Sequence, residues 1–189
     1  MSTMGSHGGA TGEGQAEILA ELGITEESTG APIVSSMEVV QVGVSKNGLP
    51  VHIDKNAYTK ADAIIITGRI KPHTSFRAPY ESGLAKMIAV GLGKQVGAEI
   101  IHSAGVENIP FRVEEIAREA LEKSKIVFAV GMIENAYDET YKIVAIPSAR
   151  IMEEEPGLLH EAHGLMPSIM FEECDVLIVD EMGKNISGS

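Results

Sequence analysis

The segment "ADAIIITGRI", residues 61–70, decides the fold that the sequence predicts. It is a continuous apolar run rich in isoleucine, as expected of a β-strand that is buried on both faces. Pro72 biases the preceding residue toward an extended backbone, so His73 begins a loop where the strand ends. Residues 73–102 then read mostly as a helix, because four apolar side chains recur at the spacing of one helical face. These are Leu84, Met87, Ile88 and Leu92.

The flanking segments extend this order of strand, loop and helix. Two alternating strands meet at Asn47-Gly48, which is the strongest short signal for a β-hairpin. Further strands are expected at 126–134, 141–147 and 174–183, and further helices at 15–23, 111–125 and 149–166, the last broken at Pro156-Gly157. Buried strands that alternate with helices predict an α/β fold: a Rossmann-like, mostly parallel sheet flanked by helices, with the hairpin as an antiparallel addition.

The composition limits the classes of partner. The chain has 15 basic and 27 acidic residues and a net charge of −12, whereas a surface for nucleic acid or an anionic membrane requires clustered lysine and arginine. A single cysteine, Cys174, excludes an internal disulfide and favours a reducing compartment. No apolar run reaches the roughly 18 residues of a membrane span. We therefore expect a cytoplasmic domain with a small-molecule partner, no nucleic acid and no membrane.

The 189 residues predict a single α/β domain that is part of a larger protein. The loop "MGSHGG", residues 4–9, opens a helix, and such a loop normally follows a strand. The last predicted strand runs almost to the end of the sequence, where an α/β protein would continue. We expect a first strand and a C-terminal domain to be missing from residues 1–189, which makes the chain a fragment of a two-domain protein.

Ligands of open α/β sheets collect beyond the carboxyl ends of the strands, and two of the predicted loops contain a histidine. His7 lies beside glycines that allow close approach to the backbone; its loop either holds a phosphate or carboxylate at the following helix or is simply flexible. His73 is a candidate general base, because its pKa lies near neutral pH, or it bonds the backbone of its own loop. Arg77 either holds a carboxylate or is a solvated surface side chain.

Other polar side chains on the predicted helices are weighed against ordinary structural roles. Lys86 lies among apolar residues, and the stem of a lysine in such a position commonly covers apolar surface while its ammonium reaches water. His102 is a candidate ligand for nickel, zinc or copper, or it complements the dipole at a helix end. His160 and His163 share one helical face and, without a third ligand, are interpreted as a solvated pair. The sequence has no Gly-rich phosphate fingerprint and no cysteine pair for zinc, so the residues alone predict a His/Lys/His cluster near strand ends.

Taken together, four motifs resemble the nickel-dependent lactate racemase family, specifically its N-terminal domain. They are "MGSHGG" at 4–9, "KPHTSF" at 71–76, "GLAKMIAVGLG" at 83–93 and "EIIHS" at 99–103. The resemblance spans nearly the whole chain. Its most specific element is the spacing of Lys86 and His102.

The resemblance implies roles for four residues. In that family a lysine holds a nickel pincer cofactor, pyridinium-3,5-bisthiocarboxylic acid mononucleotide, through a thioamide, and Lys86 matches this lysine. A histidine sixteen residues later ligates nickel, which implies that role for His102. Two further histidines act as acid and base on opposite faces of the substrate, and His7 and His73 match their motifs. The enzymes that make the cofactor are then expected partners.

The implied activity is that of an isomerase that racemises or epimerises a small 2-hydroxy acid such as lactate. One histidine takes the hydroxyl proton while hydride moves to the cofactor, and the flat keto acid takes hydride back on either face. A lysine tied into an amide carries no charge, so its burial costs little. Ala85 stands where the family usually has arginine, and Arg77 is the candidate for binding the substrate carboxylate. The alternative function is a non-catalytic α/β module that binds a small anion.

Overall fold

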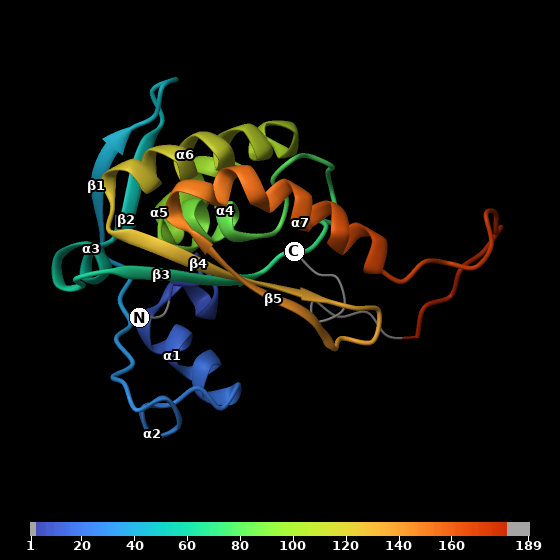
Figure 1. Ribbon diagram of the computed structural model, residues 1–189, viewed down its shortest axis with the longest axis horizontal. Coiled ribbons are helices and arrows are strands. Elements are labelled where there is room, and N and C mark those ends of the chain that lie inside the picture. Colours follow the sequence, from blue (N-terminus) through green and yellow to red (C-terminus); the bar gives the residue numbers. More distant parts are fainter. Residues whose placement is uncertain (1–2, 181–189) are drawn as a thin grey trace.

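The computed structural model describes residues 3–180, which form a mixed α/β fold (Figure 1). The strands are β1 (Val39–Val44), β2 (Pro50–Asp54), β3 (Ile64–Arg69), β4 (Ile126–Glu134) and β5 (Thr140–Pro147). The α-helices are α1 (Gly12–Glu21), α2 (Glu26–Thr29), α3 (Lys55–Lys60), α4 (Leu84–Lys86), α5 (Lys94–His102), α6 (Ile109–Lys123) and α7 (Ile151–Leu165). Shorter turns are η1 (Gly8–Ala10), the π-helical turn η2 (Met87–Gly91), η3 (Val106–Asn108) and η4 (Ser148–Arg150).

The described strands form two separate sheets. β1 and β2 pair antiparallel around Asn47-Gly48, as the sequence predicted, and Gly48 has the positive φ of 86° that favours glycine there. The second sheet has the order β3-β4-β5, in which β3 and β4 are parallel and β4 and β5 antiparallel. The expectation of a mostly parallel sheet is therefore wrong for the described residues: one pair of this sheet is parallel and the other antiparallel.

The three-stranded sheet buries one of its two faces. Ile64, Ile66 and Ala129 are buried, and α4, α6 and α7 lie together on one side of the sheet in Figure 1. Ile65 points the other way along β3 and is 51% exposed, and Ile143 on β5 is 64% exposed. The strand at 61–70 was expected to be buried on both faces. It is buried on one, because the helices that follow β3 and β5 in sequence pack on the same side.

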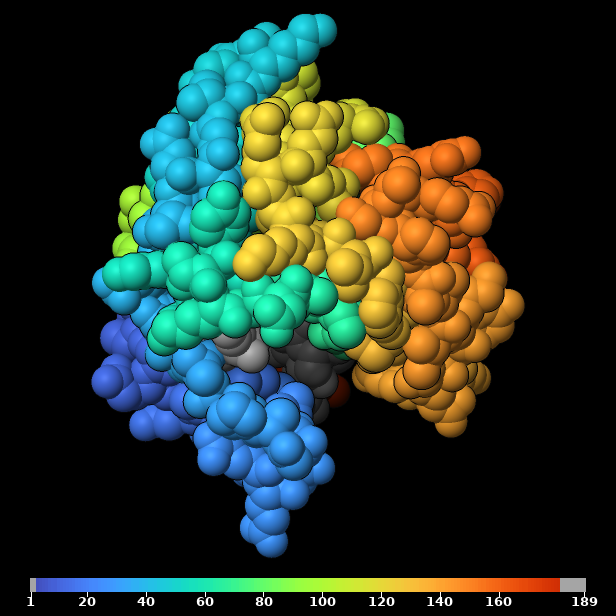
Figure 2. Space-filling model, turned by 60° about the vertical axis from the view of Figure 1, so that its left-hand side comes forward, coloured from blue at the N-terminus to red at the C-terminus, as the bar shows by residue number. Residues whose placement is uncertain are grey.

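Figure 2 shows the parts of the chain that extend from this core. The β1–β2 hairpin projects at the top of that view, and the segment around α1 and α2 projects at the bottom. Among the described residues every helix is too short or too polar to cross a lipid bilayer.

Two predicted features at the C-terminal side are wrong. Residues 174–180 do not form the expected strand; they pair with no described strand, and Val176 and Ile178 are 78% and 83% exposed. Residues 181–183 of that predicted strand lie outside the described residues. Helix α7 also runs unbroken through Pro156, which lacks an N–H for the carbonyl four residues earlier. That carbonyl, of Met152, instead accepts a hydrogen bond from the Tyr80 hydroxyl at 2.5 Å.

The segment expected as one helix over 73–102 is two helical pieces that meet at a corner. Lys94 has a φ of 55°, a left-handed conformation that ends one piece and begins α5. The two pieces cross closely, since a Cβ added to Gly97 would lie only 2.8 Å from the Ala89 carbonyl oxygen. We call residues 84–102, with their bend at Gly93 and Lys94, the helical corner.

The close crossing gives a prediction about stability. Gly97→Ala should lower the free energy of unfolding by about 1–3 kcal/mol, because the added methyl group meets backbone that has no room to give way. Gly157→Ala is the matched control inside α7, where an added Cβ meets nothing within 4 Å. The control should be neutral or more stable by up to about 1 kcal/mol. Urea unfolding curves measure both variants, and equal losses would contradict the tight crossing.

Candidate functional site

A groove of about 480 Å³ runs along the helical corner and brings together three of the residues that the sequence singled out. His7 comes from the N-terminal loop, Lys86 from the end of α4, and His102 from the end of α5. The groove is completed by Ser6, Val90, Gln95, Ala98 and Glu99. Because the chain bends at Gly93 and Lys94, Lys86 and His102 from opposite ends of the helical corner border one groove.

The N-terminal loop reaches the groove through direct packing on the helical corner. Gly5 has a φ of 59°, and a Cβ added there would lie 2.9 Å from a methyl carbon of Val90. The Thr3 carbonyl oxygen lies 2.9 Å from where a Cβ on Gly91 would be. Close backbone approach at these two glycines places His7 beside Lys86.

His73, the fourth predicted site residue, lies next to this groove but is not part of its lining. Its side chain is only 8% exposed and stacks on Phe76 with ring centroids 4.1 Å apart. Burial, followed by the charge of Lys86, lowers the pKa of His73 from 6.5 to about 4, with a smaller contribution from His102. His73 is therefore uncharged at neutral pH and sits within electrostatic reach of both groove residues.

The loop that carries His73 is anchored by Glu81, which the sequence analysis did not identify. Glu81 is 2% exposed; one carboxylate oxygen accepts from the His73 amide at 2.6 Å and the other accepts from the Ala78 amide at 3.1 Å. His163 of α7 lies 3.3 Å from the same carboxylate. The interpretation of His163 as part of a solvated pair is therefore wrong, whereas His160 is exposed as expected. The contact between His163 and Glu81 could not be predicted from local sequence patterns, because the two residues are 82 positions apart.

A hydrogen bond sets which nitrogen of His73 carries the proton. The Ser75 amide donates to Nδ1 of His73 at 3.1 Å. The neutral imidazole therefore holds its proton on Nε2. To accept a proton at Nε2, the ring must first change to the tautomer that carries its proton on Nδ1, which requires the Ser75 amide to move away.

Arg77 is occupied by backbone contacts in its own loop. Its guanidinium donates to the carbonyl oxygens of His73 and, at 2.9 Å, Phe76. It also lies 3.7 Å from Glu81, and its side chain remains 64% exposed. These contacts stabilise the His73 loop, and binding of a substrate carboxylate by Arg77 stays a prediction.

Lys86 lies at the start of the helical corner, where a buried carboxylate holds the backbone. Glu155 of α7 is 1% exposed and accepts from the Ala85 amide at 2.8 Å. Burial raises the pKa of Glu155 to about 7, although backbone hydrogen bonds from Ala85 and Leu84 oppose the rise. Burial also lowers the pKa of Lys86, and the nearby charge of Lys71 lowers it further. The Lys86 amine is therefore easier to deprotonate than a surface lysine.

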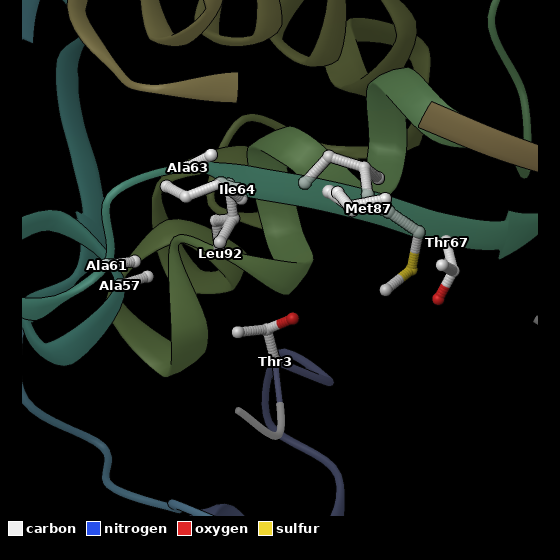
Figure 3. A pocket seen from close by; sticks show the side chains of 10 residues that line it. Thr3, Ala57, Ala61, Ala63, Ile64, Thr67, Met87 and Leu92 are labelled. Carbon is white, nitrogen blue, oxygen red and sulfur yellow. The ribbon is translucent and has the colours of Figure 1, made fainter. Parts of the chain in front are cut away.

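A second pocket, of about 310 Å³, lies along β3 (Figure 3). Thr3 lines it on one side, and Leu92 and Met87 line it where the helical corner passes β3. None of the predicted site residues lines this pocket. The candidate site is therefore the groove on the helical corner.

The fold is that of a mixed α/β domain with a lysine and histidines gathered at a helical corner, and comparison places it in a family. The model of the lactate racemase N-terminal domain matches residues 1–113, more than half of the chain. The chain therefore belongs to the lactate racemase N-terminal domain family. His7, His73, Lys86 and His102 all fall within the matched residues.

A solved structure supports the same fold. The lactate racemase apoprotein from Thermoanaerobacterium thermosaccharolyticum is similar, with a TM-score of 0.50 and 21% sequence identity. The similarity covers 64% of this chain and 30% of that chain, so the match extends over less than a third of that protein's length. No curated protein matches the chain in sequence.

The lowered pKa of His73 predicts a pH dependence of stability. Between pH 6.5 and about 4 the unfolded chain binds more protons at this histidine than the folded chain does. Stability from the neutral ring is therefore complete above pH 6.5 and is lost as the pH falls. His73→Gln should reduce the stability difference between pH 7 and pH 5.5 by about 1 kcal/mol.

Chemical unfolding at the two pH values tests this prediction. His160→Gln on the exposed side of α7 is the control, and it should keep the pH dependence of the parent. The same pH dependence in His73→Gln as in the parent would mean that the pKa of His73 is not depressed.

Proposed function

We propose that the full-length protein containing this chain is an isomerase that racemises or epimerises a small 2-hydroxy acid such as lactate, using a nickel pincer cofactor attached to Lys86. The observation that carries the proposal is the groove in which Lys86, His7 and His102 lie together, in a chain of the lactate racemase N-terminal domain family. His73 supports it from beside the groove, where Lys86 and His102 both lower its pKa.

The residues at the groove fit the cofactor that the family implies. The Lys86 amine borders the groove, and its lowered pKa increases the neutral fraction that is able to form an amide. His102 offers an exposed imidazole, and the described residues contain no group of three His, Cys, Asp or Glu side chains that could hold a metal ion. Nickel whose other ligands belong to the cofactor would need only this one protein ligand. When bound, the cofactor would supply the metal and the acceptor for hydride.

The two remaining histidines are proposed to move the proton at the substrate hydroxyl. His7 is exposed at the groove, and His73 is held on a different loop beside it. His73 is uncharged at neutral pH, as a general base must be. Movement of the Ser75 amide away from Nδ1 would allow the ring proton to shift from Nε2 to Nδ1, and Nε2 would then be free to accept the substrate proton.

The alternative, a module that only binds a small anion, fits this site less well. An anion site requires positive charge or a set of hydrogen-bond donors. At neutral pH His73 is uncharged, and burial works against the charge of Lys86. These features favour acid–base and covalent chemistry over charge attraction.

The attachment of the cofactor is tested by Lys86→Arg. If Lys86 only covers apolar surface, arginine should be tolerated because its stem and charge are similar. If Lys86 forms a thioamide, arginine cannot replace it, since its guanidinium stays protonated and is a poor acyl acceptor. The variant should keep its melting temperature but show no mass adduct after production of the full-length protein with the cofactor-making enzymes. Lys94 also carries an amine, so a peptide map must place the parent's adduct on Lys86. A fully active Lys86→Arg protein would refute the attachment.

The acid–base roles are tested by His73→Ala and His7→Ala. Each replacement should slow racemisation in both directions by roughly 10²–10⁴-fold, because every conversion uses one histidine as base and the other as acid. His160→Ala should retain parent activity. Rates are measured from each enantiomer separately in the loaded full-length protein. A loss below tenfold for His73→Ala would remove His73 from the reaction.

A further inference from the structure

The buried side chain of helix α1 is polar. Gln15 is fully buried, whereas the apolar Leu22 at the end of the helix is 69% exposed. Buried glutamine is uncommon and is retained where its amide has specific partners. Gln15 has such partners in two segments, the helical corner and the loop of residues 4–9.

The amide oxygen of Gln15 contacts the helical corner. Lys94 is fully buried, and its ammonium donates to the Gln15 oxygen at 3.1 Å. The same ammonium lies 3.3 Å from Asp54, a carboxylate that is 2% exposed. The other oxygen of Asp54 accepts from the Ala57 amide at 2.8 Å, which fixes its orientation at the start of α3.

The amide nitrogen of Gln15 contacts the loop that carries His7. It donates to the carbonyl oxygens of Gly5 at 2.9 Å and of His7 at 3.3 Å. An ammonium only donates and a carbonyl only accepts, so this orientation of the Gln15 amide satisfies both neighbours and the reverse orientation satisfies neither. One side chain therefore joins the loop to the corner.

The backbone of Lys94 adds an independent observation. Its φ of 55° is the conformation in which glycine is strongly favoured, and both Gly93 and Gly97 lie nearby. A strained residue that is not glycine indicates that its side chain is needed at that place. Lys94 both forms the corner and supplies the charged contact to Gln15.

We propose that Gln15 and Lys94 are positioning residues: they tether the loop of residues 4–9 to the helical corner and thereby set the place of His7 relative to Lys86. The consequence for catalysis rests on the proposed function, whereas the tether itself does not. Neither side chain is placed in contact with the substrate.

Gln15→Glu tests the tether with almost no change in shape. The new carboxylate keeps an acceptor for Lys94 but has no hydrogen to donate, so it faces two carbonyl oxygens without a bond to either. Hydrogen exchange at the His7 and Ala10 amides, which donate to Met4 and Ser6, should become at least tenfold faster. Exchange in α6 should stay unchanged, which shows that the core is folded.

Two further variants keep the test decisive. Gln15→Met keeps the volume without adding a buried charge, and it should loosen the loop in the same way if Gln15→Glu does not fold. Gln41→Glu, an exposed glutamine on β1, is the matched control and should leave exchange of the His7 and Ala10 amides unchanged. Unchanged exchange at His7 in both Gln15 variants would overturn the tether.

Activity separates this inference from the proposed function. In the loaded full-length protein, Gln15→Glu should lower kcat at least tenfold while the mass adduct on Lys86 and KM stay close to those of the parent. A loosened loop with unchanged kcat would overturn the positioning role. If the loop loosens but the parent protein itself shows no racemisation, the tether is supported and the proposed function fails.

Discussion

The buried ion pair between Lys94 and Asp54 is the interaction on which the arrangement of the site depends. Both side chains are almost fully removed from water, so loss of either partner would leave an uncompensated charge in the core. Asp54 ends β2 and begins α3, and Lys94 forms the bend of the helical corner. The pair therefore connects the hairpin to the segment whose two ends carry Lys86 and His102.

Two other buried carboxylates hold the backbone of the His73 loop and of the start of the helical corner. Glu81 accepts backbone hydrogen bonds from the His73 loop, and Glu155 accepts one from the residue before Lys86. Each carboxylate replaces the water that these amides would lose on burial. Helix α7 supplies Glu155 and the His163 that contacts Glu81, so a helix outside the family match supports both the His73 loop and the start of the helical corner. The site is thus held by ionised or polar groups that do not themselves border the groove.

The sequence predicted the parts of this structure that depend on local patterns. The strand at β3, the hairpin at Asn47-Gly48 and helix α6 follow from apolar periodicity and turn residues, and the family motifs anticipated that His7, Lys86 and His102 would meet. The bend at Lys94 was missed because a lysine with positive φ has no signature in sequence. The continuous helix through Pro156 was missed because it depends on a hydroxyl 72 residues away.

The missed site residues have the same explanation. Glu81 and Glu155 look like ordinary surface acids in a chain with 27 acidic residues, and only their burial against distant amides reveals a role. Gln15 was predicted only as the first residue of a short helix, and its role depends on Lys94, which lies 79 residues away. The strand expected at 174–183 was predicted from its apolar run alone. In the structure, residues 174–180 have no described strand beside them, and this apolar run is exposed.

The central claim is that Lys86 and His102 hold one nickel-bearing group between His7 and His73. Anomalous scattering at the nickel edge, from crystals of the loaded full-length protein, tests it most directly. The account predicts a single nickel peak about 2.0–2.1 Å from a ring nitrogen of His102, as for imidazole bound to a similar metal, with density continuous from the Lys86 amine. A nickel peak away from His102, or a Lys86 amine that ends without connected density, would contradict it.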